Sequence, residues 1–208
     1  DVRAPLESQD VADLVAAGPA RDAVGGLIVV GSHVDLTTQQ LAELRHRSAP
    51  AEVVIDVPQV LSPGRDVHLD GVAAEALRHL RRGNVVVSTS RDLVTGADAN
   101  DSLRLSRAVS SAVVEVVQRI LMGYTPRFVV AKGGITSSDV AARGLGITRA
   151  FVRGPMLPGI VSLWEPMDGP ARGIGYVVFA GNVGDAASLA DVVAKLSVQP
   201  IQHEGATA

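Results

Sequence analysis

The 208-residue sequence contains no cysteine. Disulfide bonds, thiolate metal sites and cysteine nucleophiles are therefore excluded together. It also lacks any run of apolar residues that approaches the roughly eighteen consecutive positions of a membrane-spanning helix. The sequence thus predicts no segment that crosses a bilayer, and we expect a cytoplasmic protein.

Positive charge is not in surplus either, because 19 Lys and Arg stand against 22 Asp and Glu and give a formal net charge of -3. Binding to nucleic acid or to an anionic membrane surface is disfavoured, since both need a dense basic face. Apolar residues make up 47% and charged residues 20% of the chain, which is typical of a globular protein and too hydrophobic for a disordered one.

Apolar segments of two kinds alternate along the first part of the chain, and this alternation predicts the fold class. Four short runs are almost continuous in Val and Ile, as strands buried on both faces of a parallel sheet require. They cover residues 26–30, 52–57, 84–88 and 127–131. Helical spacing lies between them, over 37–47 with a Thr N-cap and over 70–82 with Asp70 as N-cap and Gly83 following.

The second part of the chain begins with the strongest helical pattern, over residues 102–122. Beyond it we expect helices over 138–144 and 186–196, and strands over 149–153, 159–163 and 175–180. The proline-rich segment 154–173 is interpreted as a hairpin excursion from the main sheet. The prediction is one α/β domain over residues 1–208, Rossmann-like and layered, with a largely parallel, partly mixed central sheet flanked by helices. Residues 199–208 are expected to form a flexible tail.

Ligands of open α/β sheets bind beyond the carboxyl ends of the strands, so the loops that follow the strands are the candidate sites. The first such loop begins Gly31-Ser32-His33 and ends with Thr37 and Thr38. Gly31 permits close approach of a ligand to the backbone, and the hydroxyl groups lie beside a helix N-terminus that favours anions. A plain turn with an N-cap is the competing interpretation, and His33 is expected to be a surface histidine.

The second loop, Ser88-Thr89-Ser90-Arg91-Asp92, places three hydroxyl groups and an Arg–Asp pair after a strand. A solvated salt bridge between Arg91 and Asp92 is the favoured interpretation of that pair.

The third loop runs Lys132-Gly133-Gly134-Ile135-Thr136-Ser137-Ser138-Asp139. Paired glycines followed by hydroxyl residues at a helix start predict a nest for phosphate oxygens. The Lys precedes the glycines, so this is not a P-loop, and it is not the G-x-G-x-x-G loop of nicotinamide dinucleotide enzymes. A tight turn capped by Thr136 or Ser137 is the alternative, and Lys132 is expected to touch phosphate or to pair with an acid.

The fourth loop, Gly181-Asn182-Val183-Gly184-Asp185, again combines two glycines with an amide side chain. Asp185 is favoured as the N-cap of the last helix. Elsewhere the histidines lack metal-ligand spacing, and neither a G-x-S-x-G elbow nor a Ser–His–Asp order is present.

The four loops occur in an order that resembles the C-terminal nucleotide-binding domain of the four-carbon acid-sugar kinases, which are the ATP-dependent threonate, erythronate and oxo-tetronate kinases. The resemblance covers about residues 27–196. It implies a kinase that uses ATP and Mg²⁺ to phosphorylate a hydroxyl group of such an acid sugar. By match of motif, the implied nucleotide contacts are Ser32, Gly133, Gly134, Ile135, Thr136, Ser137, Gly181 and Asn182.

The family carries a separate N-terminal domain that binds the acid sugar, and nothing in this sequence matches it. Since the chain begins with Asp rather than Met, we expect a fragment of a longer protein that is inactive without the substrate domain. The sequence suggests no catalytic base and no protein metal ligand. A homo-oligomer is possible through an exposed sheet edge. The alternative function is a non-catalytic module that senses a nucleotide or a phosphorylated metabolite, with a Rossmann-like sugar-phosphate or nicotinamide enzyme as a distant third.

Overall fold

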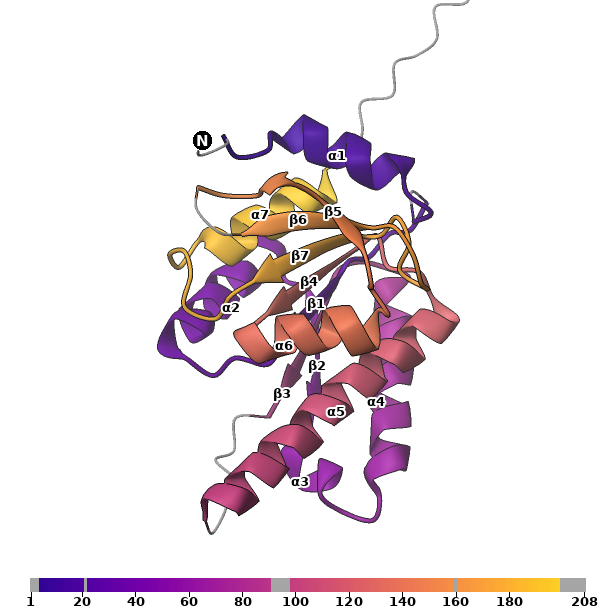
Figure 1. Ribbon diagram of the computed structural model, residues 1–208, viewed down its shortest axis with the longest axis vertical. Helices are drawn as coiled ribbons and strands as arrows, with labels where there is room; N and C mark the ends of the chain where they lie inside the picture. Colours follow the sequence, from indigo (N-terminus) through magenta and orange to yellow (C-terminus); the bar gives the residue numbers. More distant parts are fainter. Residues whose placement is uncertain (1–3, 21, 91–97, 159–160, 199–208) are drawn as a thin grey trace, which may run out of the picture.

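The computed structural model describes residues 4–20, 22–90, 98–158 and 161–198, and these form a three-layered α/β arrangement around one sheet (Figure 1). The sheet has seven strands in the order β2-β3-β1-β4-β7-β6-β5. The strands are β1 (Leu27–Val30), β2 (Ala51–Ile55), β3 (Val85–Thr89), β4 (Phe128–Lys132), β5 (Ala150–Pro155), β6 (Ser162–Pro166) and β7 (Gly175–Phe179).

Five neighbouring strands, from β2 to β7, are parallel, and β6 and β5 continue the sheet in antiparallel pairing. Every residue of β1 and β4 is buried, as the continuous Val and Ile runs predict for strands covered on both faces. The predicted fold class, a largely parallel and partly mixed sheet flanked by helices, is confirmed.

Helices cover both faces of the sheet (Figure 1). One face carries α1 (Ser8–Ala17), α2 (Asp35–Ser48) and α7 (Ser188–Ser197), whose apolar side chains pack on the side of the sheet that includes Phe128 and Phe179. The opposite face carries α3 (Val57–Val60), α4 (Arg65–Leu80), α5 (Ala99–Gly123), α6 (Gly134–Asp139) and a short π-helix (Val140–Gly144).

The long helix α5 extends three residues before and one residue beyond the predicted 102–122. Its inner side chains, Val113, Val116 and Ile120 among them, belong to the core between the sheet and α4. The guanidinium group of Arg65 on α4 donates two hydrogen bonds, of 2.8 and 2.7 Å, to the carboxylate of Glu115 on α5. This pair lowers the pKa of Glu115 and fixes the two helices to each other.

Several predicted helix starts are wrong. Helix α4 begins at Arg65 after Gly64, not at the predicted Asp70 cap. Helix α2 begins at Asp35 after Val34, because the hydroxyl group of Thr37 is directed inside the protein rather than to the helix N-terminus. The last helix begins at Ser188, although the Asp185 carboxylate does accept hydrogen bonds from the Ala187 amide and the Ser188 hydroxyl just ahead of it.

The segment 154–173 contributes to the main sheet instead of leaving it, since β5 and β6 pair with each other and β6 pairs with β7. The strand predicted over 159–163 lies at Ser162–Pro166, and residues 159–160 are outside the described part of the chain. Residues 199–208, the predicted tail, are also outside it. None of the described helices is both long enough and apolar enough to cross a membrane.

Candidate functional site

The strand order changes direction at β1, which has β3 and β2 on one side and β4 and β7 on the other. The chain therefore leaves the sheet in opposite directions on the two sides of β1, and a crevice opens at the carboxyl end of such a switch point. The loops after β1, β4 and β7 all begin at this edge, and these are three of the four loops that the sequence selects.

Ser32, Gly133 and Gly181, one from each of these loops, lie together. A methyl group built on Gly181 would lie 2.9 Å from Ser32 Oγ, and its nearest contact with Gly133 would be 3.9 Å, at Cα. Gly133 adopts φ +125°, a conformation that residues with a side chain rarely accept, and this lets β4 turn directly into α6. The structure thus brings three of the expected contacts to one point.

A second close approach joins the β1 loop to the start of α6. A methyl group on Gly31 would lie 2.1 Å from Thr136 Oγ1, so only glycine allows the two segments this near. The amide of Gly31 donates to Lys132 O at 3.1 Å and the amide of Gly133 donates to Phe179 O at 2.8 Å. These bonds extend the β-ladders by one residue and hold the loops at the sheet edge.

The remaining expected contacts divide into exposed and buried residues. Gly134 and Asn182 are exposed, and a methyl group on Gly134 would meet nothing within 4 Å. Ile135 is 75% exposed. Ser137, in contrast, is buried, and its hydroxyl lies 2.7 Å from Ala131 O and 2.6 Å from Gly133 O. Its side chain therefore stabilises the loop from inside.

The helix after β4 begins at Gly134, four residues earlier than predicted, and Gly133 is its N-cap. The alternative interpretation, a tight turn capped by Thr136 or Ser137, is therefore wrong, because both residues lie within the helix. The hydroxyl of Tyr176 donates to Ser137 O at 2.6 Å and anchors α6 to β7. Burial raises the pKa of Tyr176 far above its usual range, so this donor keeps its proton.

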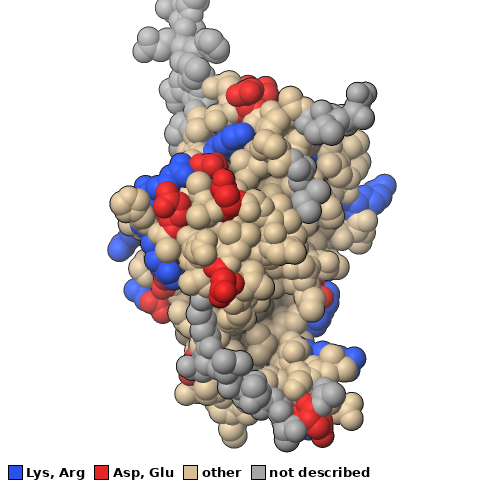
Figure 2. Space-filling model, turned by 90° about the vertical axis from the view of Figure 1, so that its left-hand side faces the viewer, with Lys and Arg blue, Asp and Glu red and all other residues tan. Residues whose placement is uncertain are grey.

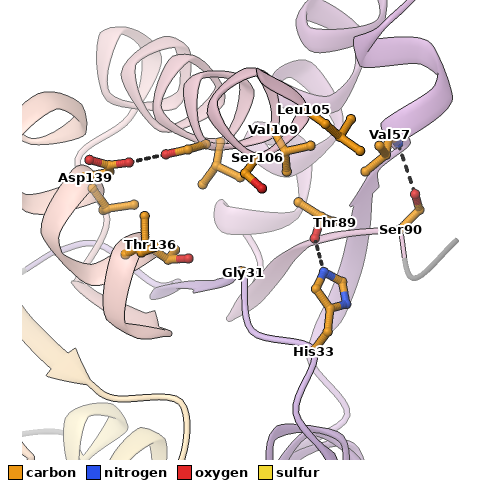
Figure 3. A pocket seen from close by; sticks show the side chains of 14 residues that line it. Gly31, His33, Val57, Thr89, Ser90, Leu105, Ser106, Val109, Thr136 and Asp139 are labelled. Atoms are coloured by element: carbon orange, nitrogen blue, oxygen red, sulfur yellow. Dashed lines mark hydrogen bonds between the residues drawn. The ribbon is translucent and has the colours of Figure 1, made fainter. Parts of the chain in front are cut away.

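A cavity of about 650 Å³ opens beside these loops, between α5 and the carboxyl ends of β1 and β3 (Figure 3). Helix α5 supplies a mostly apolar wall, and α6 lines the cavity on the side next to α5. The lining residues are Gly31, His33, Val57, Thr89, Ser90, Leu105, Ser106, Val109, Ser110, Val113, Ile135, Thr136, Asp139 and Val140. The cavity was not predicted, because Val109 and Val113 carry the same helical spacing as the core residues of α5.

Several polar groups of the cavity are held by hydrogen bonds between elements (Figure 3). His33 Nε2 lies 3.0 Å from Thr89 Oγ1, and Ser90 Oγ accepts from the amide of Val57 at 3.0 Å. The Ser110 hydroxyl donates to the Asp139 carboxylate. His33 is exposed, as expected, but it also lines the cavity. Arg91 and Asp92, the expected salt bridge, lie outside the described residues.

Lys132 does not pair with an acid among the described residues, unlike one of its two expected roles. Its side chain is fully buried, and its Nζ donates to the carbonyl oxygens of Ala180 at 2.8 Å and Gly181 at 3.0 Å. The ammonium group also lies 4.1 Å from the centre of the Phe179 ring. Burial lowers the pKa of Lys132 to about 8. A lysine at the end of an otherwise apolar strand is the sequence signal that marks such a buried charge.

Figure 2 looks onto the carboxyl edge of the sheet, where the surface is hollowed and uncharged residues make up most of the surroundings of the hollow. Neither Lys nor Arg is among the residues that line the cavity. Within the described ranges, no three His, Asp or Glu side chains gather closely enough to hold a metal ion. An anion bound here would therefore depend on backbone amides, hydroxyl groups and the buried charge of Lys132.

Solved structures share the fold of this chain. A Bordetella bronchiseptica protein from a domain family of unknown function, solved with bound citrate as a domain-swapped dimer, superposes with a TM-score of 0.71 at 20% identity. The match covers 90% of this chain and 43% of that one. A putative tRNA synthase from Salmonella typhimurium gives a TM-score of 0.63 at 22% identity, over 82% of this chain and 40% of that one.

Sequence comparison gives a relative with a named activity. The chain is 31% identical over 185 residues to a 3-oxo-isoapionate kinase from Paraburkholderia graminis, and the match covers 81% of this chain and 38% of the relative. The chain therefore spans about two fifths of the length of that kinase. Residues 27–189 match the family described as nucleotide-binding C-terminal domain. The resemblance noted in the sequence is confirmed, and the chain belongs to this family of C-terminal nucleotide-binding domains of acid-sugar kinases.

Proposed function

We propose that this chain is the ATP-binding half of a cytoplasmic kinase that phosphorylates a hydroxyl group of a four-carbon acid sugar, such as threonate, erythronate or an oxo-tetronate. The observation that carries the proposal is the meeting of Ser32, Gly133 and Gly181 at one edge of the sheet, beside a cavity of about 650 Å³. Family membership and the kinase relative support the same assignment.

Phosphoryl transfer depends mainly on positioning the phosphate groups and on stabilising their charge. The glycine turns at the ends of β4 and β7 expose backbone amides, and Ser32 and Thr136 add hydroxyl groups that donate hydrogen bonds to phosphate oxygens. Gly134 leaves open space next to these donors. In our proposal the triphosphate lies across these turns, in contact with Ser32, the 133–137 turn and the 181–182 turn.

The nucleoside occupies the cavity. Leu105, Val109 and Val113 form an apolar wall on which a purine ring packs, and the His33–Thr89 pair and the Ser106 hydroxyl offer polar contacts. The cavity shares Gly31 and Thr136 with the cluster of turns, so one nucleotide can reach both parts.

The chemistry of the described donors fits Mg²⁺ that arrives with the nucleotide. Mg²⁺ usually keeps several waters and is held by substrate phosphates with one or two carboxylates, so a cage of three protein ligands is not needed. Asp139 is the one carboxylate among the residues that line the cavity. It is the residue we propose to hold the ion, which would neutralise phosphate charge when bound.

Affinity for ATP tests the proposal. Titration calorimetry with ATP and Mg²⁺ should show binding to the unmodified chain and none to Gly134→Val, whose branched side chain enters the open space beside the turn. Gly83→Val is the matched control, because a side chain there also meets nothing within 4 Å but lies before β3, at the other edge of the sheet. Equal ATP affinity in all three proteins would contradict the proposal.

The acid sugar itself is assigned to a substrate-binding half outside this chain, which also supplies the catalytic base. The isolated chain should therefore bind ATP without turnover. Adding the substrate-binding half of the parent protein should restore ADP release with threonate, erythronate or an oxo-tetronate. ATP binding without ADP release from the combined halves would favour a sensing module instead.

A further inference from the structure

Three buried side chains hold the loop between β7 and α7 by its carbonyl groups. Lys132 Nζ donates to Ala180 O and Gly181 O, at 2.8 and 3.0 Å, and Thr37 Oγ1 donates to Gly181 O at 3.2 Å. Gln40 Nε2 donates to the carbonyl groups of residues 183 and 185, at 3.0 and 2.7 Å. We call Thr37, Gln40 and Lys132 the carbonyl clamp and residues 180–185 the clamped loop.

Holding carbonyl groups inward fixes where the amide groups point. In a planar trans peptide the C=O of one residue and the N–H of the next point in opposite directions. The described chain contains no cis peptide bond. The amides that follow the clamped carbonyls, on Gly181, Asn182, Gly184 and Ala186, therefore point away from the clamp. No described residue accepts a hydrogen bond from these four amides.

The carbonyl clamp lowers the free energy of unfolding, and this cost indicates that it serves the site. All three side chains are fully buried. Lys132 carries a charge into the interior without a carboxylate partner among the described residues. Gln40 Oε1 is buried and has no hydrogen-bond partner within the described chain. An apolar core at these positions would avoid both costs, but it would leave the loop carbonyls unpaired.

We propose that the carbonyl clamp positions the clamped loop so that its outward amides bind the phosphate groups of the nucleotide. This inference rests on the proposed function and adds residues that do not themselves touch the ligand. Thr37, Gln40 and Lys132 are positioning residues, and they act through the backbone of the loop. Lys132 adds its positive charge beneath the phosphates, in a chain that has only two lysines.

The two lysines provide a matched pair for the test. Lys195 Nζ also donates to two backbone carbonyls, Leu6 O at 2.9 Å and Met156 O at 3.0 Å, but these belong to the segments around α1 and β5. Lys132→Met should weaken ATP binding by about tenfold or more and change adenosine binding by less than about twofold. Lys195→Met should change neither.

Thr37 gives a second variant in case Lys132→Met does not fold. Thr37→Val keeps the shape and removes the hydroxyl donor, so ATP affinity should fall while adenosine affinity is kept. Thr37→Ser restores the donor and should restore ATP affinity. An equal loss for ATP and adenosine would overturn the inference, because it would mean general damage to the site.

The dependence of ATP affinity on pH separates positioning from a purely structural role. Deprotonation of Lys132 above pH about 8 should weaken ATP binding in the unmodified chain and not in Lys132→Met. Folding stability should change with the opposite sign. Between pH about 8 and 10.5 the unfolded chain retains the lysine proton and the folded chain loses it, so the free energy of unfolding rises with pH.

Four other titratable groups lie near Lys132 in the fold. His33, Asp35, Asp139 and Asp185 lie on the surrounding segments, and none forms a hydrogen bond or ion pair with its ammonium group. Absence of ATP binding in the unmodified chain would overturn the proposed function and this inference together. ATP binding that Lys132→Met and Thr37→Val both retain would overturn this inference alone.

Discussion

At the scale of single residues, the site depends on where a side chain is missing. Gly133 turns the chain through a conformation with φ +125°, and Gly31 and Gly181 allow neighbouring loops to touch. The order of glycines and hydroxyl residues was sufficient to select these positions from the sequence. The role of Lys132 was not predictable in the same way, because it depends on which backbone groups lie above it in the folded chain.

Replacing Gly133 by Ala should destabilise the protein by about 1–3 kcal/mol, since a residue with a Cβ is strained at this backbone conformation. The added methyl group would also lie 3.2 Å from Thr136 Oγ1. Gly134→Ala is the control, because its φ is ordinary and the space around it is open, so its stability should change by less than about 1 kcal/mol. Urea unfolding followed by circular dichroism measures both; similar stabilities would show that Gly133 is not constrained.

At the scale of helices and strands, the sequence predicted the buried parallel strands and α5, because their apolar periodicity is long and unambiguous. It missed α1 and α3 and placed several helix starts wrongly. The start of α6 was missed because a helix that follows a glycine turn directly needs no polar cap. The cavity was missed because the α5 residues that line it continue the apolar face of the helix that packs in the core. The two parts of this face differ only in whether another element packs against them.

The wall of α5 yields a prediction about the nucleoside. Val109→Trp should fill part of the cavity and weaken adenosine and ATP binding alike, by about tenfold or more. Because Val109 faces open space, the melting temperature should stay within about 3 °C of the unmodified chain. Leu103→Trp on the same helix is the control, since Leu103 is 49% exposed and does not line the cavity. Unchanged adenosine affinity in Val109→Trp would place the nucleoside elsewhere.

At the scale of the whole molecule, one sheet positions the loops of the candidate site. The switch in strand order at β1 places the loops after β1, β4 and β7 at the same edge, although they are separated by about a hundred and fifty residues of sequence. The sequence predicted this convergence because it predicted parallel strands. It did not predict that the antiparallel pair β6 and β5 would extend the same sheet, since prolines around these strands indicated an excursion.

In our proposal these three loops bind the triphosphate of a nucleotide together. Amide chemical shifts of the isotope-labelled chain, recorded by NMR during titration with ATP and with adenosine, test it most directly. We expect ATP to shift the amides of Ser32, Gly133 and Gly181 together, and adenosine to leave these three unchanged while it shifts Val109. ATP-induced shifts confined to other parts of the chain would contradict it.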